Sequence, residues 1–273
     1  MKTVLITGAS GDLGTHLRRE LRGQYVLRLS DLRPIVAKQS GETFVRGDLA
    51  SLPAMMKVVK DVDAVVALGG FPEESSWPTI LRANIVGAYN LYEAARRNGV
   101  RRVLFASSNH ATGFFPRQQK IDHRVYPRPD SRYGLSKVFG EQAGFLYAEK
   151  YGLEVFCMRI GNVTPQPVDK RRLSNWISPR DFAQLVRIGI DHPKVHFEIV
   201  YGVSGNDRSF YDNANATRLG FAPQDNSELY AAAILKREPP AKDPRTEIFQ
   251  GGLLVTGEGD PKRKPPAATK RRR

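Results

Sequence analysis

A glycine-rich turn near the start of the chain separates an apolar run from an amphipathic segment. Residues 1–7 form a short run rich in β-branched side chains, and Gly8, Gly11 and Gly14 follow it. Leucines then recur at a helical interval, at Leu13, Leu17 and Leu21. A buried strand that turns through glycine into a helix leaves backbone N–H groups free at the positive helix end, where a phosphate can approach closely. The chain is therefore predicted to begin with a strand, a phosphate-binding turn and a helix.

A second strand-like run ends at an acidic residue. Residues 25–30 follow the first predicted helix, and Asp31 comes directly after them. A carboxylate at this point accepts hydrogen bonds from the 2′-hydroxyl of an adenosine ribose and repels a 2′-phosphate, which favours NAD over NADP. Arg28 and Arg33 leave the opposite preference open, because an arginine beside the ribose could pair with a phosphate.

Strand-like and helix-like segments alternate through the first 160 residues. This order is typical of a parallel sheet with helices on both faces. Further strands are expected at 43–45, 47–49, 64–68, 103–107 and 154–159. Further helices are expected at 52–60, 77–98 and 131–151, with a proline-rich loop at 109–130. The predicted fold class is α/β, with a doubly wound parallel sheet.

Several polar or small residues follow directly after the predicted strands. They include Gly8, Asp31, Gly69 and Ser108. Right-handed crossovers bring the carboxyl ends of parallel strands to one edge of the sheet, and ligands bind at that edge. These residues are therefore expected to lie along one binding site.

Tyr133 and Lys137 are four residues apart within the predicted helix 131–151, so their side chains share one helix face. A tyrosine with its ordinary pKa of about 10 is a poor base at neutral pH, and a nearby ammonium lowers that pKa. A surface helix carries such a pair by chance as well. Ser108, at the end of a predicted strand, completes a possible proton-transfer unit with them.

The sequence changes in character after residue 160. A loop containing Pro165 and Pro167 is followed by a helix whose start, at 178–181, has serine, proline and a carboxylate in favourable positions. A strand at 197–201 and two shorter helices come next. The predicted organisation is a dinucleotide-binding core at 1–160, a small substrate-covering region integrated with it at 161–258, and a disordered basic tail at 259–273.

The net charge of +14 is concentrated at the end of the sequence. Residues 261–273 contain seven basic and no acidic residues, so they supply half of it. Prolines, a block of like charge and the lack of an apolar pattern predict disorder there. The tail could contact nucleic acid nonspecifically, but no zinc-finger spacing, aromatic RNA-binding motif or helix-turn-helix pattern supports a nucleic-acid role for the rest.

Cysteine usage and hydropathy bear on the compartment. With one cysteine, Cys157, the chain cannot form an internal disulfide. No apolar run approaches the ~20 residues needed to cross a bilayer. The sequence enters its first strand without a signal-like apolar segment. These observations predict a cytoplasmic protein that makes no membrane contact.

Three motifs together identify a family. Through Gly8-x-x-Gly11-x-x-Gly14, the run at 107–110 and Tyr133-x-x-x-Lys137, the chain resembles the extended short-chain dehydrogenase/reductases. Over roughly residues 1–255 it is similar to the bacterial uronate dehydrogenases. This closer resemblance rests on the segments 90–96, 105–110, 159–161, 171–176 and 249–252. It implies a Rossmann-like fold, NAD as cofactor, and oxidation of the C1 hydroxyl of galacturonate or glucuronate to an aldarolactone.

The resemblance also implies roles for individual residues. Tyr133 would remove the C1 hydroxyl proton, Ser108 would hold the same oxygen, and Lys137 would favour the phenolate and bind the nicotinamide ribose. His110 would bind the sugar by hydrogen bonds, although a histidine that only packs the loop is the alternative. Arg171 would bind the C6 carboxylate, a task that suits a planar bidentate donor, although a basic surface loop is the alternative.

Motifs and resemblance together give the complete predicted site, which contains no metal. The predicted cofactor-binding residues are Gly8, Ser10, Gly11, Asp12, Leu13, Gly14, Asp31, Asp48, Leu49, Leu68, Gly69, Asn84, Tyr133, Lys137 and Ile160. The predicted substrate-binding residues are Ser108, Asn109, His110, Tyr133, Asn162 and Arg171. A homo-oligomer is expected by analogy, because the helices at 77–98 and 131–151 lie where this superfamily often pairs subunits.

Two departures from the family pattern concern the substrate. Pro72 and Asn162 stand where the family usually has serine, and Ser75 or Ser76 could replace the contact that Pro72 lacks. Asn162 can still donate and accept hydrogen bonds. The alternatives are a C1 dehydrogenase of a neutral aldose or a sugar phosphate, a sugar-nucleotide epimerase or dehydratase, and a non-catalytic NAD-binding protein.

Overall fold

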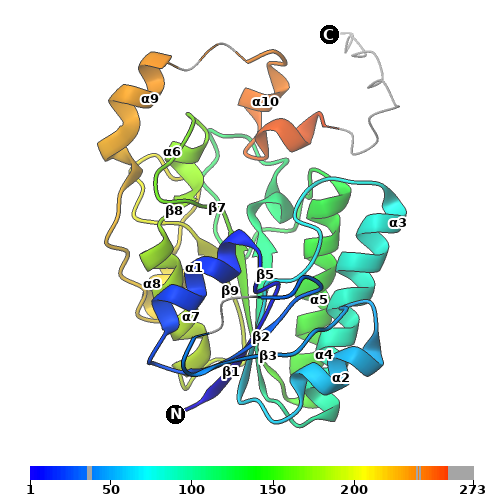
Figure 1. Ribbon diagram of the computed structural model, residues 1–273. Helices are drawn as coiled ribbons and strands as arrows, with labels where there is room; N and C mark the ends of the chain where they lie inside the picture. The colour runs from blue at the N-terminus through cyan, green and yellow to red at the C-terminus, as the bar shows by residue number, and fades with distance from the viewer. Residues whose placement is uncertain (36–38, 238, 240, 258–273) are drawn as a thin grey trace.

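The computed structural model describes residues 1–35, 39–237, 239 and 241–257, which form a twisted parallel sheet with helices on both faces (Figure 1). Within these residues the main sheet has seven strands in the order β3-β2-β1-β4-β5-β6-β9. They are β1 (Thr3–Thr7), β2 (Val26–Ser30), β3 (Glu42–Phe44), β4 (Ala64–Ala67), β5 (Arg102–Ser108), β6 (Glu154–Ile160) and β9 (Phe197–Gly202). A small parallel pair, β7 (Asn162–Val163) and β8 (Trp176–Ile177), lies outside it. The predicted fold class is confirmed.

Helices and helical turns connect the strands. They are α1 (Asp12–Leu21), α2 (Leu52–Val59), α3 (Trp77–Ile80), η1 (Leu81–Val86), α4 (Gly87–Arg97), η2 (Asn109–Thr112), α5 (Arg132–Tyr151), α6 (Arg172–Asn175), α7 (Pro179–Asp191), α8 (Ala214–Arg218), η3 (Ser227–Tyr230), α9 (Ala231–Arg237), α10 (Arg245–Ile248) and η4 (Gly252–Val255). The long helix predicted at 77–98 is interrupted by η1, a π-helical segment between α3 and α4.

The strand predicted at 47–49 is not a strand. Strand β3 ends at Phe44, and Asp48 instead forms a turn in which its carboxylate accepts from the Ala50 N–H at 2.9 Å. The next residue in the turn, Ser51, caps α2 by accepting from the Ala54 N–H. Asp48 therefore ends the extended segment, because its side chain offers the backbone a local hydrogen bond.

The strand order places a crevice at the carboxyl edge of the sheet. Strand β1 lies between β2 and β4, so the chain crosses over one face of the sheet from β1 to β2 and over the other face after β3. At such a reversal the loops that follow adjacent strands diverge and leave room for a ligand. The glycine-rich turn after β1 and the loop after β4 form the two sides of this opening.

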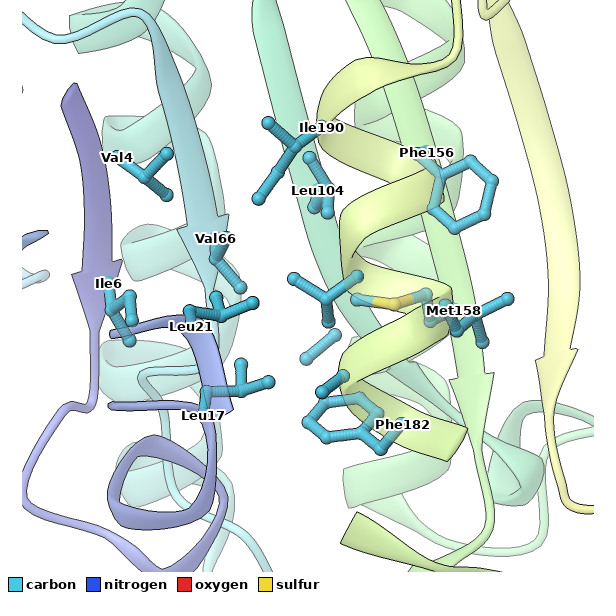
Figure 2. Packing of buried hydrophobic residues seen from close by; sticks show 14 of the residues in the cluster. Val4, Ile6, Leu17, Leu21, Val66, Leu104, Phe156, Met158, Phe182 and Ile190 are labelled. Atoms are coloured by element: carbon cyan, nitrogen blue, oxygen red, sulfur yellow. The ribbon is translucent and has the colours of Figure 1, made fainter. Parts of the chain in front are cut away.

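Two apolar layers hold the helices against the sheet. On one face, Leu17 and Leu21 of α1 and Phe182 and Ile190 of α7 pack among buried strand residues (Figure 2). On the other face, helices α2, α4 and α5 cover residues of β1, β4, β5 and β6. Burial on both sides explains why the strands are apolar runs without alternation.

Residues after β6 contribute both to the main sheet and to a layer above it. Strand β9 pairs with β6, and α7 packs on the sheet beside α1. Helices α6, α9 and α10 lie beyond the carboxyl edge of the strands (Figure 1). The tail predicted at 259–273 lies outside the described residues. No helix in the described ranges is both long and apolar enough to cross a membrane.

A buried ion pair links α5 to strands β5 and β6. The Glu141 carboxylate on α5 accepts two bonds from Arg159 on β6, from Nε and Nη2, both at 2.9 Å. It also accepts from the Ser107 hydroxyl on β5 at 2.5 Å. The side chains of Arg159 and Glu141 are 2% and 0% exposed. This cluster fixes the helix that carries Tyr133 and Lys137 against the strand that ends at Ser108.

Candidate active site

A cavity of about 730 Å³ runs along the carboxyl edge of the main sheet. Most of the predicted site residues line it: Gly8, Gly11, Asp12, Leu13, Asp31, Asp48, Leu49, Leu68, Gly69, Ser108, Tyr133, Lys137, Ile160 and Asn162. The remaining predicted residues are not part of this lining: Ser10, Gly14, Asn84, Asn109, His110 and Arg171. The structure thus brings residues at or after the ends of β1 to β6 to one opening, as the topology of a doubly wound sheet requires.

The glycine-rich turn forms a cradle that side chains would fill. Gly8 has a φ of +67°, and a Cβ added there would lie 2.8 Å from the backbone N of Gly69. A Cβ at Gly14 would lie 2.6 Å from the Cα of Ala9. The close approach leaves the first turn of α1, which begins after Gly11, facing the cavity. Such a helix end suits the pyrophosphate of a dinucleotide.

Asp31 is held as an anion at the end of β2. Its carboxylate accepts from the backbone N–H groups of Ser10 and Arg33, each at 3.1 Å. Burial acts to raise the pKa of Asp31, but these hydrogen bonds outweigh it and hold the pKa below its ordinary value. The Arg28 guanidinium donates to the carbonyls of Val58 and Lys60 at the end of α2, away from this carboxylate. Of the two arginines that weakened the preference for NAD, Arg33 alone lines the cavity.

Arg82 is a cavity residue that the sequence did not single out. It lies in η1, lines the cavity, and donates to the Asp48 carboxylate at 2.5 Å. Asp48 was predicted to bind the cofactor. In the structure its carboxylate is paired with Arg82 at the cavity where the cofactor is expected. An exposed arginine in a long helical segment has no distinguishing pattern in the sequence, and its place at the cavity depends on how α3 and η1 pack.

Ser108, Tyr133 and Lys137 meet at the centre of the cavity. Ser108 ends β5, and Ser131 caps α5 by accepting from the Gly134 N–H at 2.9 Å, which places Tyr133 in the first turn of the helix. The Lys137 ammonium donates to the Ala106 carbonyl at 2.8 Å. Its nitrogen lies 5.3 Å from the centre of the Tyr133 ring. The three predicted catalytic residues are therefore neighbours.

Burial controls the acidity of this group. Burial raises the pKa of Tyr133 to about 12, although a hydrogen bond with Ser108 acts in the opposite direction. Burial also lowers the pKa of Lys137 to about 8. The predicted lowering of the tyrosine pKa by the ammonium is therefore opposed by burial in the protein without cofactor. The ammonium is held by a backbone carbonyl, 5.3 Å from the centre of the tyrosine ring.

Hydrogen bonds connect the loop after β4 to α5. Asn84 accepts from the Phe71 N–H at 2.7 Å and donates to the Ser136 hydroxyl on α5 at 3.0 Å. Glu74 accepts from the backbone N–H of Tyr133 at 2.9 Å. Asn84 thus supports the loop beside the cavity, and its predicted contact with the cofactor stays a prediction.

The residue in this loop that replaces the family serine lies at the cavity itself. Pro72 is part of the lining, whereas Ser75 and Ser76 are placed outside it. The Ser76 hydroxyl is within 3.0 Å of the Thr79 hydroxyl, at the start of α3. Pro72 lies closer to the cavity lining than Ser75 and Ser76, and whether either serine replaces the missing contact stays a prediction.

Asn109, Arg171 and Gln250 form a polar corner beside the cavity. With the Asn109 amide nitrogen donating to the Ile160 carbonyl at 3.1 Å, its oxygen accepts from Arg171 Nη2 at 2.6 Å. Arg171 Nε donates to the Gln250 carbonyl at 2.7 Å. The sequence did not identify Gln250, because it contributes a backbone oxygen and comes from a segment 79 residues further along the chain.

Arg171 differs from its two basic neighbours in its partners. Lys170 pairs with Glu247 at 3.7 Å, and Arg172 pairs with Asp169. Within the described residues, Arg171 forms no salt bridge, and its guanidinium donates to the neutral oxygens of Gln250 and Asn109. Burial lowers the pKa of Arg171. The Asp130 carboxylate acts on Arg171 electrostatically without forming a salt bridge with it in the described residues. A half-buried guanidinium bonded to neutral oxygens is a position where an anionic ligand is favourable.

His110 lies beside Tyr133 at the start of η2. Its ring makes an edge contact with the tyrosine ring, with 5.9 Å between centres. Its Nδ1 is 2.7 Å from the carboxylate of Asp130. Burial lowers the pKa of His110, although the hydrogen bond to Asp130 acts to raise it. Among the described residues, no three acidic, histidine or cysteine side chains are grouped as metal ligands.

The fold and the site together define an NAD-linked oxidoreductase. The features that define it are the parallel sheet, the glycine cradle, the anionic Asp31 and the group of Ser108, Tyr133 and Lys137. A model of the NAD dependent epimerase/dehydratase family matches residues 4–186. The chain belongs to this family. The predicted class of enzyme and its NAD dependence are thereby confirmed.

Individual relatives narrow the comparison. The chain is 43% identical over 254 residues to a uronate dehydrogenase from Pseudomonas putida, covering 92% of this chain and 95% of the relative. It superposes with a TM-score of 0.91 on the crystal structure of glucuronic acid dehydrogenase from Chromohalobacter salexigens, at 42% identity and covering 95% and 99% of the two chains. It superposes equally, at 0.91 and 40% identity with the same coverage, on a mutant uronate dehydrogenase from Agrobacterium tumefaciens complexed with NAD. The resemblance inferred from the motifs is confirmed.

Proposed function

We propose that this protein oxidises the C1 hydroxyl of a cyclic hexuronate, galacturonate or glucuronate, to an aldarolactone, with NAD as the hydride acceptor. The observation that carries the choice of an acidic sugar is Arg171. Its guanidinium is half-buried, lies against Asn109 beside the cavity, and has no salt bridge within the described residues. A carboxylate would accept two parallel hydrogen bonds from such a planar donor and neutralise its charge.

The catalytic group supports proton removal at C1. In the proposed arrangement Tyr133 takes the proton of the C1 hydroxyl, and Ser108, at the end of the adjacent strand, holds the same oxygen. Lys137, fixed to the Ala106 carbonyl, keeps a positive charge 5.3 Å from the tyrosine ring. NAD, when bound, supplies the hydride acceptor and a second positive charge. Because burial raises the pKa of Tyr133, the base depends on these positive charges to reach its phenolate form.

The substrate class is tested by NADH formation. Purified protein is mixed with NAD and one sugar at a time, and absorbance of NADH is followed. Galacturonate and glucuronate are expected to be oxidised with far higher kcat/KM than arabinose, glucose or glucose 6-phosphate. Turnover of a neutral aldose or of the sugar phosphate, with none for the two uronates, would contradict the proposal and favour the corresponding alternative substrate.

Arg171→Ala is expected to raise KM for uronates by about tenfold to a hundredfold, since hydrogen bonds to charged groups contribute about 1.5–3 kcal/mol. The smaller part of the effect is expected in kcat, because the carboxylate is bound equally in the ground state and the transition state. Steady-state kinetics with galacturonate checks this. Lys170→Ala is the matched control, because its side chain pairs with Glu247 and is 47% exposed. Equal KM values in the two variants would remove Arg171 from carboxylate binding.

We also propose that the protein forms a homo-oligomer through helices α4 and α5. Apolar side chains are exposed along one face of α5, at Leu135, Phe139 and Leu146. The same kind of residue is exposed on the adjoining α3–α4 segment, including Trp77 and Tyr89. Soluble monomers rarely expose apolar patches of this extent, so a second copy of the chain is the proposed partner.

Leu146→Glu is expected to shift the protein from oligomer toward monomer, because it places a charge in the proposed apolar interface. Light scattering coupled to size-exclusion chromatography measures the mass. Leu229→Glu is the matched control, since Leu229 is 84% exposed and belongs to η3. A monomeric wild-type protein would refute this interface.

The proposed compartment is the cytoplasm. Cys157 is buried within β6 as a free thiol, and burial raises its pKa well above the ordinary value, so it is suited to packing rather than to reaction. Fractionation of cells that produce the full chain, with NADH formation as the readout, tests the location.

A further inference from the structure

Asp130 is a buried carboxylate at the active site that neither the motifs nor the family resemblance assigned. It lies in the loop before α5, with a side chain that is 0% exposed. One oxygen lies 2.7 Å from His110 Nδ1, and the other accepts from the Ser131 hydroxyl at 2.8 Å. Its backbone N–H donates to the His110 carbonyl at 3.3 Å. A carboxylate enclosed in this way limits how the His110 ring can be oriented, because it bonds to Nδ1 of that ring.

The surrounding backbone is shaped to admit this carboxylate. A Cβ at Gly113 would lie 1.8 Å from Asp130 Oδ2, and one at Gly251 would lie 1.9 Å from the same oxygen. A Cβ at Gly134 would lie 2.4 Å from the His110 carbonyl oxygen. Three separate segments therefore have glycine where a side chain would displace Asp130 or His110. The Gly251 N–H also donates to the Gly113 carbonyl at 2.9 Å, which closes the enclosure.

The contact with Asp130 determines where His110 carries its proton. An ionised carboxylate only accepts hydrogen bonds, so the imidazole nitrogen that faces it must be protonated. Burial keeps the ring neutral by lowering its pKa, and the positive charges of Arg171 and Arg172 act in the same direction. A neutral ring protonated at Nδ1 has an unprotonated Nε2, which is a hydrogen-bond acceptor. The hydrogen bond that the ring makes to another described side chain is the one at Nδ1, which leaves Nε2 for a ligand.

We propose that Asp130 is a positioning residue that fixes the Nδ1–H tautomer of His110, so that Nε2 accepts a hydrogen bond from a hydroxyl of the sugar substrate. The ring lies with its centre 5.9 Å from that of Tyr133, so this hydroxyl belongs to the part of the sugar near the reacting carbon. This inference rests on the proposed function, because it requires a hydroxylated substrate in the cavity. It goes further by assigning the direction of one hydrogen bond and the residue that sets it.

The tautomer itself is tested without substrate by nitrogen NMR of protein labelled with ¹⁵N-histidine. The chain has five histidines, and a His110→Gln spectrum assigns the signal of interest. The wild type is expected to show a protonated Nδ1 and an unprotonated Nε2. In Asp130→Asn the carboxamide can donate to Nδ1, so the population is expected to shift toward Nε2–H. The same exchange beside a catalytic histidine in serine proteases preserves the geometry but changes the tautomer.

The functional consequence is tested by kinetics on the same variant. Asp130→Asn is expected to raise KM for uronates by about tenfold to a hundredfold, with a smaller change in kcat and unchanged NAD binding. Asp122→Asn is the matched control, because Asp122 lies in the same loop but pairs with Arg124 and not with His110. Urea unfolding of both variants establishes that they fold.

Each outcome decides a different point. An Nε2–H tautomer in the wild type, or an Asp130→Asn spectrum identical to it, would overturn the positioning role. A changed tautomer with an unchanged KM would overturn the assignment of Nε2 as the sugar-binding acceptor. Failure of the wild type to oxidise any uronate would refute the proposed function, while the tautomer measurement would still stand.

Discussion

Replacing Tyr133 with phenylalanine is expected to lower kcat for uronate oxidation by about 10²- to 10⁴-fold, the range attributed to a positioned general base. The change removes one oxygen and retains the ring, which packs against His110 and lies over Lys137. The cradle for the cofactor, built from Gly8 and Gly14, is untouched. NAD affinity is therefore expected to stay close to that of the wild type.

The measurement has two parts. Steady-state kinetics gives kcat for wild type and variant, and titration calorimetry gives the dissociation constant for NAD. Tyr126→Phe is the matched control, since Tyr126 is 85% exposed. Unaltered kcat in Tyr133→Phe would eliminate the tyrosine as the base, and loss of NAD binding would point to a structural role.

The pH dependence of kcat/KM should distinguish the wild type from Tyr133→Phe. Because burial raises the pKa of Tyr133 to about 12, its phenolate fraction increases as pH rises through the neutral and alkaline range. Wild-type kcat/KM is therefore expected to rise with pH through the neutral range and to level off above about pH 8, where the Lys137 ammonium loses its proton. The residual activity of Tyr133→Phe should lack this rise.

The second large effect is expected in stability. Glu141→Ala leaves the Arg159 guanidinium, whose side chain is 2% exposed, buried without its carboxylate. Breaking a buried ion pair from one side costs about 3–5 kcal/mol, because the remaining charge has lost both water and partner. The loss should be visible as a lower free energy of unfolding in urea, followed by tryptophan fluorescence.

A double variant separates loss of the pair from loss of packing. Glu141→Leu combined with Arg159→Met replaces both charges with apolar side chains of similar size, and such exchanges are often neutral or stabilising. The double variant is therefore expected to be more stable than Glu141→Ala. If the free energy of unfolding of Glu141→Ala is within about 1 kcal/mol of the wild-type value, the buried pair contributes little to stability and the argument from burial fails.

The sequence predicted which residues of the cofactor side lie at the carboxyl edge of the sheet, for a physical reason. The glycines at 8, 11 and 14 and the acid at 31 act within a local strand–turn–helix unit, and the parallel sheet brings strand ends together by topology alone. Ser108 and Tyr133 could be paired in advance for the same reason. Their positions depend on a strand end and a helix start, which the sequence predicted through the apolar run at 103–107 and the helix at 131–151.

The substrate side depended on contacts that no local pattern encodes. Asp130 faces His110 because the loop before α5 folds back over η2, and Arg82 reaches the cavity because η1 interrupts the long helix. The hydrogen bond from the Phe71 N–H to Asn84 likewise has no local pattern in the sequence. The burial that raises the pKa of Tyr133 also depends on tertiary packing, because spacing shows only which side chains share a helix face.

The segment that closes the polar corner comes late in the chain. The Gln250 carbonyl accepts from Arg171, and the Gln250 N–H donates to the Phe115 carbonyl. Gln250 therefore connects two segments that precede it in the sequence. During synthesis, the dinucleotide cradle at the start of the chain emerges from the ribosome well before Gln250 does. A nascent chain could therefore acquire its cofactor, and the stability that binding confers, before its sugar-binding corner exists.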